Sequence, residues 1–227
     1  MIQITYYGHA CFEIVCNGKS MLFDPFIRGN ELAKDVDVSK INPDTIFITH
    51  AHSDHTADAV EIAKQSNATL VGMYEVCSYL QKQGAPKIHP MNIGGSWNFD
   101  NVDVKMTPAI HSSSFADGTY GGIAGGFNIK ANNQHIYFAG DTALFSDMAL
   151  IGKQYPLDLA ILPIGGNFTM DYKDGVEAAK LLNVKKVIGM HYDTFGLIKI
   201  NHEEAISAFK SENIELQLMT IGSTIKL

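Results

Sequence analysis

The chain contains a single arginine, Arg28, among its 227 residues, and its formal net charge is −7. Proteins that grip nucleic acids usually present a basic surface, and arginine is the side chain best shaped to bind phosphate groups and base edges. We therefore expect no nucleic-acid partner, whereas a small-molecule substrate is compatible with this composition. We interpret Arg28 as a solvated loop residue, and the alternative is an anchor for an anionic group.

The sequence also lacks a membrane-spanning run and a cysteine framework. No apolar stretch approaches the about 20 residues that a transmembrane helix needs, and residues 1–7 alternate like a strand, unlike a secretory signal. Cys11, Cys16 and Cys77 form an odd set without Cys-x-x-Cys spacing, which predicts neither disulfides nor a thiolate metal site. We therefore expect a cytoplasmic protein with no membrane partner.

The rest of the composition is that of an ordinary globular protein. Hydrophobic residues make up 46% of the chain and charged residues 18%, and the length allows a sizeable buried core. We expect residues 1–227 to form a single domain. The sequence neither indicates nor excludes a homo-oligomer.

The hydrophobic pattern predicts two successive sets of strands, each followed by strand–helix units. Alternating or continuous apolar segments predict strands at 2–7, 11–16, 20–23, 45–49, 69–72, 88–91, 97–108, 158–164, 186–190 and 215–220, and a hairpin at 122–139. Helices are expected at 57–66, 74–83, 172–183 and 202–212, with a loop at 26–44. Residues 223–226 are a candidate partner for the last strand. This order predicts an α/β protein with two sheets.

Three histidines and one aspartate gather in Thr49-His50-Ala51-His52-Ser53-Asp54-His55, directly after an apolar run. Side chains two apart on an extended backbone point the same way, so His50 and His52 can hold one cation. The turn into the following helix directs Asp54 and His55 towards a second cation. Imidazole and carboxylate groups together suit zinc, iron or manganese. The alternative interpretation is three surface histidines beside a helix start.

Three further polar residues stand at the ends of predicted strands. His111 and His191 each follow an apolar strand, and Asp141 follows Gly140. Strand ends at one edge of a sheet converge in space even when they are far apart in sequence. Singly, a strand-end histidine is more often a hydrogen-bonded structural residue, and Gly-Asp is a common turn. Together with the histidine motif, these three residues predict one shared metal site.

The His-x-His-x-Asp-His motif, followed in order by His111, Asp141 after a glycine, and His191, resembles the metal-binding pattern of the metallo-β-lactamase superfamily of dinuclear metal hydrolases. The resemblance implies a four-layer αββα sandwich built from two pseudo-duplicated halves. It implies a first metal site of His50, His52 and His111, and a second of Asp54, His55 and His191, with Asp141 bridging the two. It also implies two divalent metal ions, zinc first and manganese or iron as alternatives, and a hydroxide that bridges them as the nucleophile.

Tyr7-Gly8-His9-Ala10 resembles a segment of one branch of that superfamily, which includes ascorbate-6-phosphate lactonase-like enzymes and uncharacterised metal-dependent hydrolases. His9 is then a candidate substrate contact or the acid that protonates the leaving group, and the alternative is a structural turn histidine. Asp24 matches a recurrent superfamily aspartate, so we expect it to orient a ligand histidine, with an ordinary turn aspartate as the alternative. Asn167 is a candidate substrate contact or a loop cap.

The resemblance implies a metal-dependent hydrolase, and the branch resemblance implies a small ester, lactone or phosphoester metabolite as its substrate. Asp54 is expected both to ligate a metal and to accept a hydrogen bond from the nucleophile. Two alternatives are an iron-dependent redox member of the same superfamily and a metal-stabilised binding protein without turnover. The constellation serves several reactions, so it does not identify the substrate. We interpret His89, His135 and His202 as structural or solvated.

Overall fold

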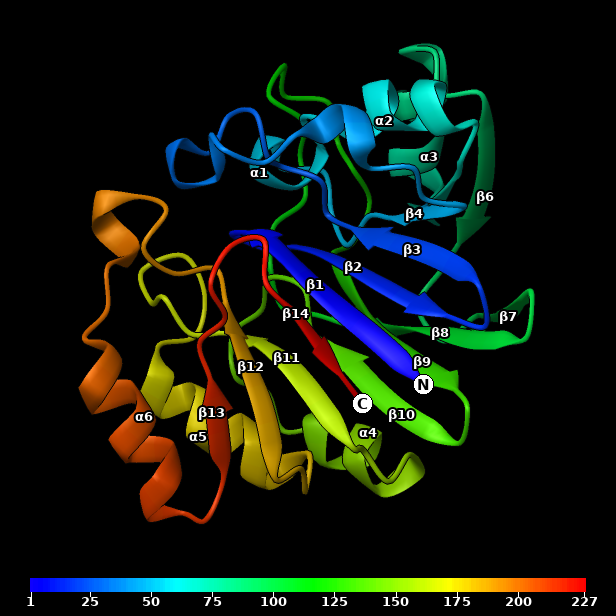
Figure 1. Cartoon of the computed structure of the whole chain (residues 1–227). Helices are drawn as coiled ribbons and strands as arrows, with labels where there is room; N and C mark the ends of the chain where they lie inside the picture. Colours follow the sequence, from blue (N-terminus) through cyan, green and yellow to red (C-terminus); the bar gives the residue numbers. More distant parts are fainter.

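Two seven-stranded mixed sheets pack against each other in the computed structural model, which describes residues 1–227 (Figure 1). The first sheet has the order β14 (Thr224–Lys226), β1 (Ile2–Gly8), β2 (Cys11–Cys16), β3 (Lys19–Phe23), β4 (Thr45–Phe47), β5 (Thr69–Met73), β6 (Lys87–Met91). The second has the order β13 (Glu215–Gln217), β12 (Lys186–Met190), β11 (Leu159–Pro163), β10 (Gln134–Phe138), β9 (Gly125–Ala131), β8 (Val102–Pro108), β7 (Ser96–Phe99).

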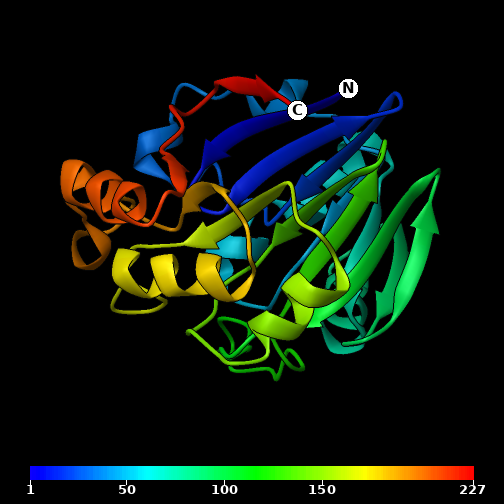
Figure 2. The same ribbon diagram turned by 90° about the horizontal axis from the view of Figure 1, so that it is seen from below.

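Helices cover the outer face of each sheet. The helices are α1 (Ser53–Thr56), α2 (Ala59–Ser66), α3 (Tyr74–Lys82), α4 (Met148–Gln154), α5 (Tyr172–Leu181) and α6 (His202–Ser211), with short 3₁₀ turns at Glu31–Ala33, Val38–Lys40 and Gly196–Ile198. Helices α2 and α3 contact β5 and β6, whereas α5 and α6 contact β11 and β13. The two helical layers enclose the two sheets (Figures 1 and 2). The structure therefore confirms the four-layer αββα sandwich.

The main core lies between the two sheets, where aromatic rings from both sides meet. The ring of Phe23 on β3 stacks on that of Phe47 on β4, with centroids 4.9 Å apart. It also contacts Phe138 on β10 at 4.8 Å and Phe127 on β9 at 6.1 Å. All four side chains are fully buried. Each such side chain contributes about 2 kcal/mol by leaving water, so this contact holds the two halves together.

The two halves repeat one pairing scheme. Strands β1, β2 and β3 pair antiparallel, and β3 to β6 then pair in parallel. Strands β8, β9 and β10 likewise pair antiparallel, and β10 to β13 pair in parallel. An antiparallel edge strand, β14 or β7, flanks each set. The predicted pseudo-duplication is confirmed, and it brings the ends of β3, β4, β10 and β12 to one edge of the sandwich.

Several element predictions need correction. Strand β14 pairs with β1 of the other sheet, with Ile4 opposite Ile225, and not with β13. This pairing satisfies the otherwise open edge of β1, because Ile2 and Leu227 exchange backbone hydrogen bonds at 3.2 and 2.9 Å. The predicted helix 57–66 corresponds to α2, which begins at Ala59, and the turn expected before it forms the short helix α1. The loop 26–44 contains two 3₁₀ turns. Helix α4 was not predicted, since its seven residues are too few for a clear amphipathic period.

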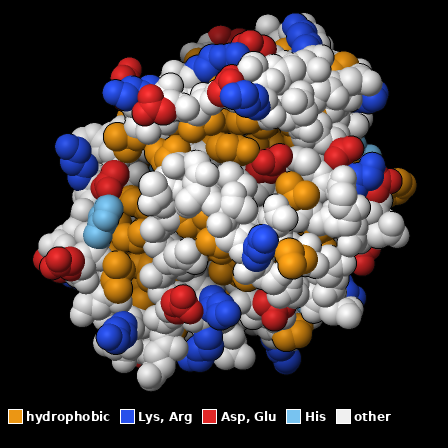
Figure 3. All heavy atoms as spheres, viewed as in Figure 1, with side chains coloured by type: hydrophobic (Ala, Val, Ile, Leu, Met, Phe, Trp, Pro, Cys, Tyr) orange, Lys and Arg blue, Asp and Glu red, His pale blue; other side chains and the backbone are white.

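None of the helices combines the length and apolarity needed to cross a membrane. On the face drawn in Figure 3, acidic and basic side chains are interspersed and do not gather into an area of one sign. Hydrophobic side chains are visible between them in small groups. Histidine and aspartate side chains gather instead at the edge of the sandwich where the parallel strands end.

Candidate metal centre

Polar residues occupy the first positions beyond several strands of the two sheets. His9, Asp24 and His191 directly follow β1, β3 and β12, and each has a left-handed backbone with φ of +57°, +44° and +56°. Histidine and aspartate tolerate this conformation better than bulky residues do. Such strained positions cluster at functional sites, because the surrounding structure must hold them in place. The backbone N–H of His191 also donates to the carbonyl of His9 at 2.9 Å, which joins the two halves.

A first group consists of His50, His52 and His111, and one ring nitrogen of each lies within 4.8 Å of those of the other two. His50 and His52 follow β4, with His50 Nε2 and His52 Nδ1 2.9 Å apart. His111 arrives from the other sheet, three residues beyond β8, and its ring centroid lies 4.9 Å from that of His50 and 5.0 Å from that of His52. The structure thus brings together the three residues expected at the first metal site.

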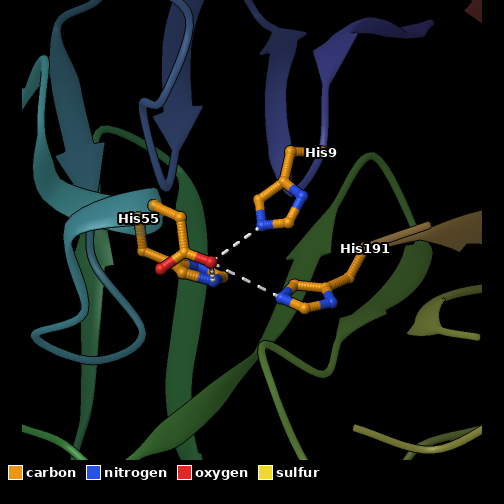
Figure 4. A group of neighbouring side chains, drawn as sticks. His9, His55 and His191 are labelled. Atoms are coloured by element: carbon orange, nitrogen blue, oxygen red, sulfur yellow. Dashed lines mark hydrogen bonds and ion pairs between the residues drawn. The ribbon is translucent and has the colours of Figure 1, made fainter. Parts of the chain in front are cut away.

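A second group consists of Asp54, His55 and His191, with His9 beside them (Figure 4). Asp54 and His55 lie in the short helix α1. The Oδ2 atom of Asp54 lies 3.7 Å from His191 Nε2, 3.9 Å from His55 Nε2 and 3.0 Å from His9 Nε2. The residues expected at the second metal site therefore also converge, and His9 adds a third imidazole to this group.

Asp141 lies between the two groups. Its Oδ2 atom is 3.9 Å from His50 Nε2 and 3.5 Å from His111 Nε2 on one side. On the other side it is 3.3 Å from His55 Nε2 and 3.0 Å from His191 Nε2. The preceding Gly140 has φ of +62°, and a Cβ there would stand 2.8 Å from the side chain of Thr49. Only glycine therefore lets this loop approach β4 closely enough to place Asp141 at the centre.

The donor set fits divalent cations. His55 Nε2 and Asp141 Oδ1 are buried and have no hydrogen-bond partner, although buried polar atoms are nearly always paired. Both atoms belong to groups that commonly ligate zinc and iron-group metals. Clustered imidazoles and carboxylates are also expensive to bury without a cation. The residues present therefore suit metal ions at this position.

One buried carboxylate sets the orientation of a histidine in each group. Asp24 Oδ2 lies 2.8 Å from His55 Nδ1. Thr49 donates its hydroxyl proton to the same oxygen at 2.7 Å and its N–H to Oδ1 at 2.8 Å. Because the hydroxyl hydrogen of Thr49 is already engaged with Asp24, the hydroxyl oxygen accepts a hydrogen bond from His50 Nδ1 at 2.9 Å. Both histidines therefore carry a proton on Nδ1, so in the neutral imidazole that a metal ion binds, the lone pair of Nε2 points into the cluster.

The charges of the cluster are strongly coupled. Burial opposes ionisation of Asp141, but His55 and His191 outweigh it and hold the pKa of this carboxyl well below its usual range. Burial also opposes the charged form of His191, yet Asp141 raises its pKa to about 9. In His50, burial and then the neighbouring His55 hold the pKa well below the usual value. These shifts favour ionised Asp54 and Asp141, protonated His55 and His191, and a neutral His50 until a cation binds.

His9 is buried and bonded at both ring nitrogens. Its Nε2 faces Asp54, and its Nδ1 lies 2.9 Å from Thr194 Oγ1. The ring also packs on those of His191 and Phe195, with centroids 4.2 and 5.4 Å away. Burial lowers the pKa of His9 to about 4. This geometry favours a role in positioning Asp54 over direct contact with a substrate.

A pocket of about 970 Å³ opens over the cluster. Its polar lining includes His52, Asp54, His111, Asp141, His191, Ser112 and Asn167. Its apolar lining comes from Phe26, Phe168, Phe195 and Leu197. Asn167 has φ of +52° and precedes Phe168, which is half exposed at the mouth. The four apolar residues and Ser112 were not foreseen, because isolated loop residues carry no periodic signal.

None of the remaining candidates belongs to the histidine and aspartate groups. Arg28 pairs with the buried Asp58, which directly precedes α2, and with Glu61 on that helix. His202 Nε2 lies 2.6 Å from Asp193 Oδ2, and His89 packs against Trp97 and Phe99. His135 begins β10, with its ring beside Tyr155.

Comparison with known proteins agrees with this architecture. Residues 20–192 match the model of the β-lactamase superfamily domain. A metal-dependent hydrolase of Flavobacterium johnsoniae is 51% identical over 226 residues, which cover 100% of both chains. Among solved structures, a metallo hydrolase from the hyperthermophilic archaeon Ignicoccus hospitalis is 33% identical, with a TM-score of 0.89 over 99% of this chain and 97% of that one.

A more distant likeness concerns the fold alone. An isothiocyanate hydrolase from Delia radicum gut bacteria is 18% identical, with a TM-score of 0.79 over 99% of this chain and 98% of that one. The family match includes His50, His52, Asp54, His55, His111, Asp141 and His191, and the strands from β4 to β12. The chain therefore belongs to the metallo-β-lactamase superfamily and is one of its metal-dependent hydrolases.

Proposed function

We propose that the protein uses two divalent cations, most naturally zinc, to hydrolyse a small ester or lactone that carries an apolar substituent. Manganese and iron are the alternative metals. The observation that carries the proposal is the position of Asp141, whose Oδ2 lies within 3.9 Å of histidine nitrogens from both groups. One carboxylate oxygen between two sets of ligands is the arrangement that a pair of bridged cations requires.

Paired cations in such a site acidify water and polarise the bond under attack. The chain contributes the orientation of the reactants. Asp54 lines the pocket, and its side chain keeps 23% of its surface exposed while His9 holds one of its oxygens. We assign Asp54 a double role, as a metal ligand and as the acceptor of a hydrogen bond from the attacking water. This fixes the direction from which the water meets the substrate.

The pocket wall narrows the substrate class. Phe168, Phe195 and Leu197 remain exposed at its mouth, at 50%, 36% and 70% of their surface. Exposed apolar side chains around a polar floor favour a substrate with a hydrophobic group beside the scissile bond. The uncharged polar groups of Ser112 and Asn167 also line the pocket. This lining suits a neutral acyl compound better than a phosphorylated metabolite.

The test combines elemental analysis with a substrate panel. The purified protein is reconstituted with zinc, manganese or iron and assayed on aryl esters, lactones, thioesters and phosphodiesters. We expect about two metal ions per chain and the highest turnover with acyl esters or lactones. Asp141→Asn should lose most of the metal and the activity together, whereas the exposed Asp147→Asn should retain both. One metal per chain, or full turnover in Asp141→Asn, would refute the proposal.

The panel also separates the two other functional classes. An iron-loaded protein that consumes oxygen and leaves every ester intact would identify a redox member of the superfamily. A protein that binds two metals but turns over no compound would indicate a binding role. Either result would replace the hydrolytic proposal.

A further inference from the structure

His52 presents a different ring nitrogen to the first histidine group than its neighbour His50 does. The Nδ1 atom of His52 lies 2.9 Å from Nε2 of His50, whose own Nδ1 faces Thr49. The two nitrogens of an imidazole point in divergent directions, so Nε2 of His52 points away from this contact. A cation held among His50, His52 and His111 would therefore take Nδ1 of His52, and the proton of that neutral ring would reside on Nε2.

The hydroxyl of Ser112 lies beside this second nitrogen. Its Oγ atom is 3.3 Å from His52 Nε2. His50 and His55 are held at Nδ1 by the buried hydrogen-bond chain built on Asp24, whereas the ring of His52 has Ser112 as its one partner outside the cluster. Since a metal-bound Nδ1 leaves the proton on Nε2, the hydroxyl oxygen of Ser112 is the acceptor of this hydrogen bond.

The loop between β8 and β9, which carries Ser112, is fixed against the backbone that joins His50 to His52. The hydroxyl of Ser113 accepts the N–H of Ala51 at 3.2 Å and donates to the carbonyl of Gly121 at 3.1 Å. The N–H of Gly121 returns a hydrogen bond to the carbonyl of Ser113 at 2.9 Å. A Cβ at position 121 would stand 2.2 Å from that of Ala51. Only glycine therefore lets the loop lie this close to the histidine motif.

The outer part of the same loop is attached to α3, in the other half of the sandwich. The ring of Phe115 stacks on that of Tyr79 with centroids 3.7 Å apart. The Tyr79 hydroxyl also donates to Asp117 Oδ2 at 2.8 Å. The loop thus begins beside the ligand His111 of one half and is held in place by the other half. Its attachment gives the hydroxyl of Ser112 a defined position over His52.

We propose that Ser112 is a positioning residue of the first metal site. Its hydroxyl oxygen accepts the Nε2–H of His52 and so keeps Nδ1 of that ring directed at the cation. The inference rests on the proposed occupation of the His50, His52 and His111 group by a divalent cation. Outer partners of this kind fix the orientation of a ligand histidine and raise its basicity. Because Ser112 contacts no residue of the second group, it acts on one metal ion and not on the other.

The test uses the zinc-loaded full chain and two measurements. Long-range ¹⁵N–¹H spectra of the histidine rings should show the proton of His52 on Nε2 and its zinc bond at Nδ1. Competition with a chromogenic chelator should show that Ser112→Ala binds the zinc ion of the first site about tenfold more weakly. The resonances of His55 and His191 should be unchanged, because the second site stays occupied.

Two further variants separate the hydroxyl from the loop. Ser112→Thr retains the hydroxyl and should restore the zinc affinity of the first site. Ser114→Ala, at an exposed position of the same loop, is the control and should bind zinc like the wild type. The melting temperature of metal-free Ser112→Ala should equal that of the wild type, because Ser112 is exposed.

Three results would overturn the assignment while the two-cation hydrolase stands. These are a proton on Nδ1 of His52 in the zinc-loaded wild type, an unchanged zinc affinity in Ser112→Ala, and an equal loss of affinity in Ser112→Ala and Ser112→Thr. A wild-type chain whose His50, His52 and His111 bind no zinc would instead refute both this inference and the proposed function.

Discussion

Asp24 Oδ2 lies 2.8 Å from His55 Nδ1, and both side chains are completely buried. The same Asp24 oxygen accepts a hydrogen bond from the Thr49 hydroxyl, and the Thr49 hydroxyl oxygen in turn faces His50 Nδ1. A single carboxylate therefore orients one imidazole in each of the two histidine groups. Partners of this kind raise the basicity of a metal-binding imidazole and fix its tautomer.

Replacing Asp24 should therefore weaken metal binding at both positions. Asp24→Asn keeps the shape of the side chain but loses the negative charge that holds His55 and Thr49. We expect the metal affinity to fall about 10- to 100-fold, measured by competition with a chromogenic chelator. Asp35→Asn, at an exposed loop position, is the matched control.

The link through Thr49 allows the two effects to be separated. Thr49→Val is close in shape and removes only the hydroxyl that relays to His50. It should weaken the site of His50, His52 and His111, whereas the Asp24–His55 contact remains. If Asp24→Asn and Thr49→Val bind both metal ions as tightly as the wild type does, this hydrogen-bond chain does not tune the metal affinity of the site.

Much of the fold could be predicted from the sequence because the relevant signals are local. The Asn17-Gly18 turn, the alternation of β1 and β2, and the apolar runs of β11 and β12 are each readable within a few residues. The pairing of β14 with β1 cannot be read from a local segment, because it joins residues more than 200 positions apart and depends on which sheet edge is open. The last strand of a chain carries little information about its partner.

The residues of the candidate site likewise divide into those that local sequence signals reveal and those whose position depends on the tertiary fold. His111, Asp141 and His191 could be singled out because each is a polar residue at the end of an apolar strand, and the structure brings all three to the histidine motif. Phe168 and Leu197 could not, because their place at the pocket mouth depends on how the loops after β11 and β12 fold. Ser112 also resembles any loop residue in sequence. Its contact with His52 is visible only in three dimensions.

His9 should act by holding Asp54 in place. His9→Asn suits the left-handed backbone of this position, but its shorter side chain does not reach Asp54. We expect the metal content to fall towards one ion per chain and the turnover number to fall with it, while the shape of the pH–rate profile is retained. His9→Gln, which is long enough to restore a hydrogen bond, should recover part of both.

The acid role for His9 predicts a different pattern. An acid is needed only when the leaving group is a poor one, so activated aryl esters would react normally in His9→Asn while alkyl esters would not. Metal content would also be unchanged. This result would assign His9 to proton transfer and exclude the positioning role.

Metal binding should release protons at neutral pH. Burial disfavours a charged His191, but Asp141 outweighs it and raises the pKa from 6.5 to about 9. A raised pKa in the folded state stabilises the metal-free protein below pH 6.5, and this contribution is lost as the pH rises through 9. A metal needs the neutral imidazole, so the apparent affinity should rise over that interval. Calorimetric titration at pH 7 in buffers of different ionisation enthalpy measures the number of protons released on metal binding. A value of zero would contradict the raised pKa of His191.

The apolar rim of the pocket should set the preference for acyl chain length. Leu197, 70% exposed on the loop after β12, can bury part of its side chain against a long acyl group but not against an acetyl group. Leu197→Ser should therefore raise KM for an octanoyl ester about fivefold and leave that for the acetyl ester unchanged, with the turnover numbers retained. Leu150→Ser on α4, 61% exposed, controls for loss of a surface leucine elsewhere. If KM rises equally for both esters, Leu197 shapes the loop, and the hydrophobic selectivity assigned to the pocket mouth is wrong.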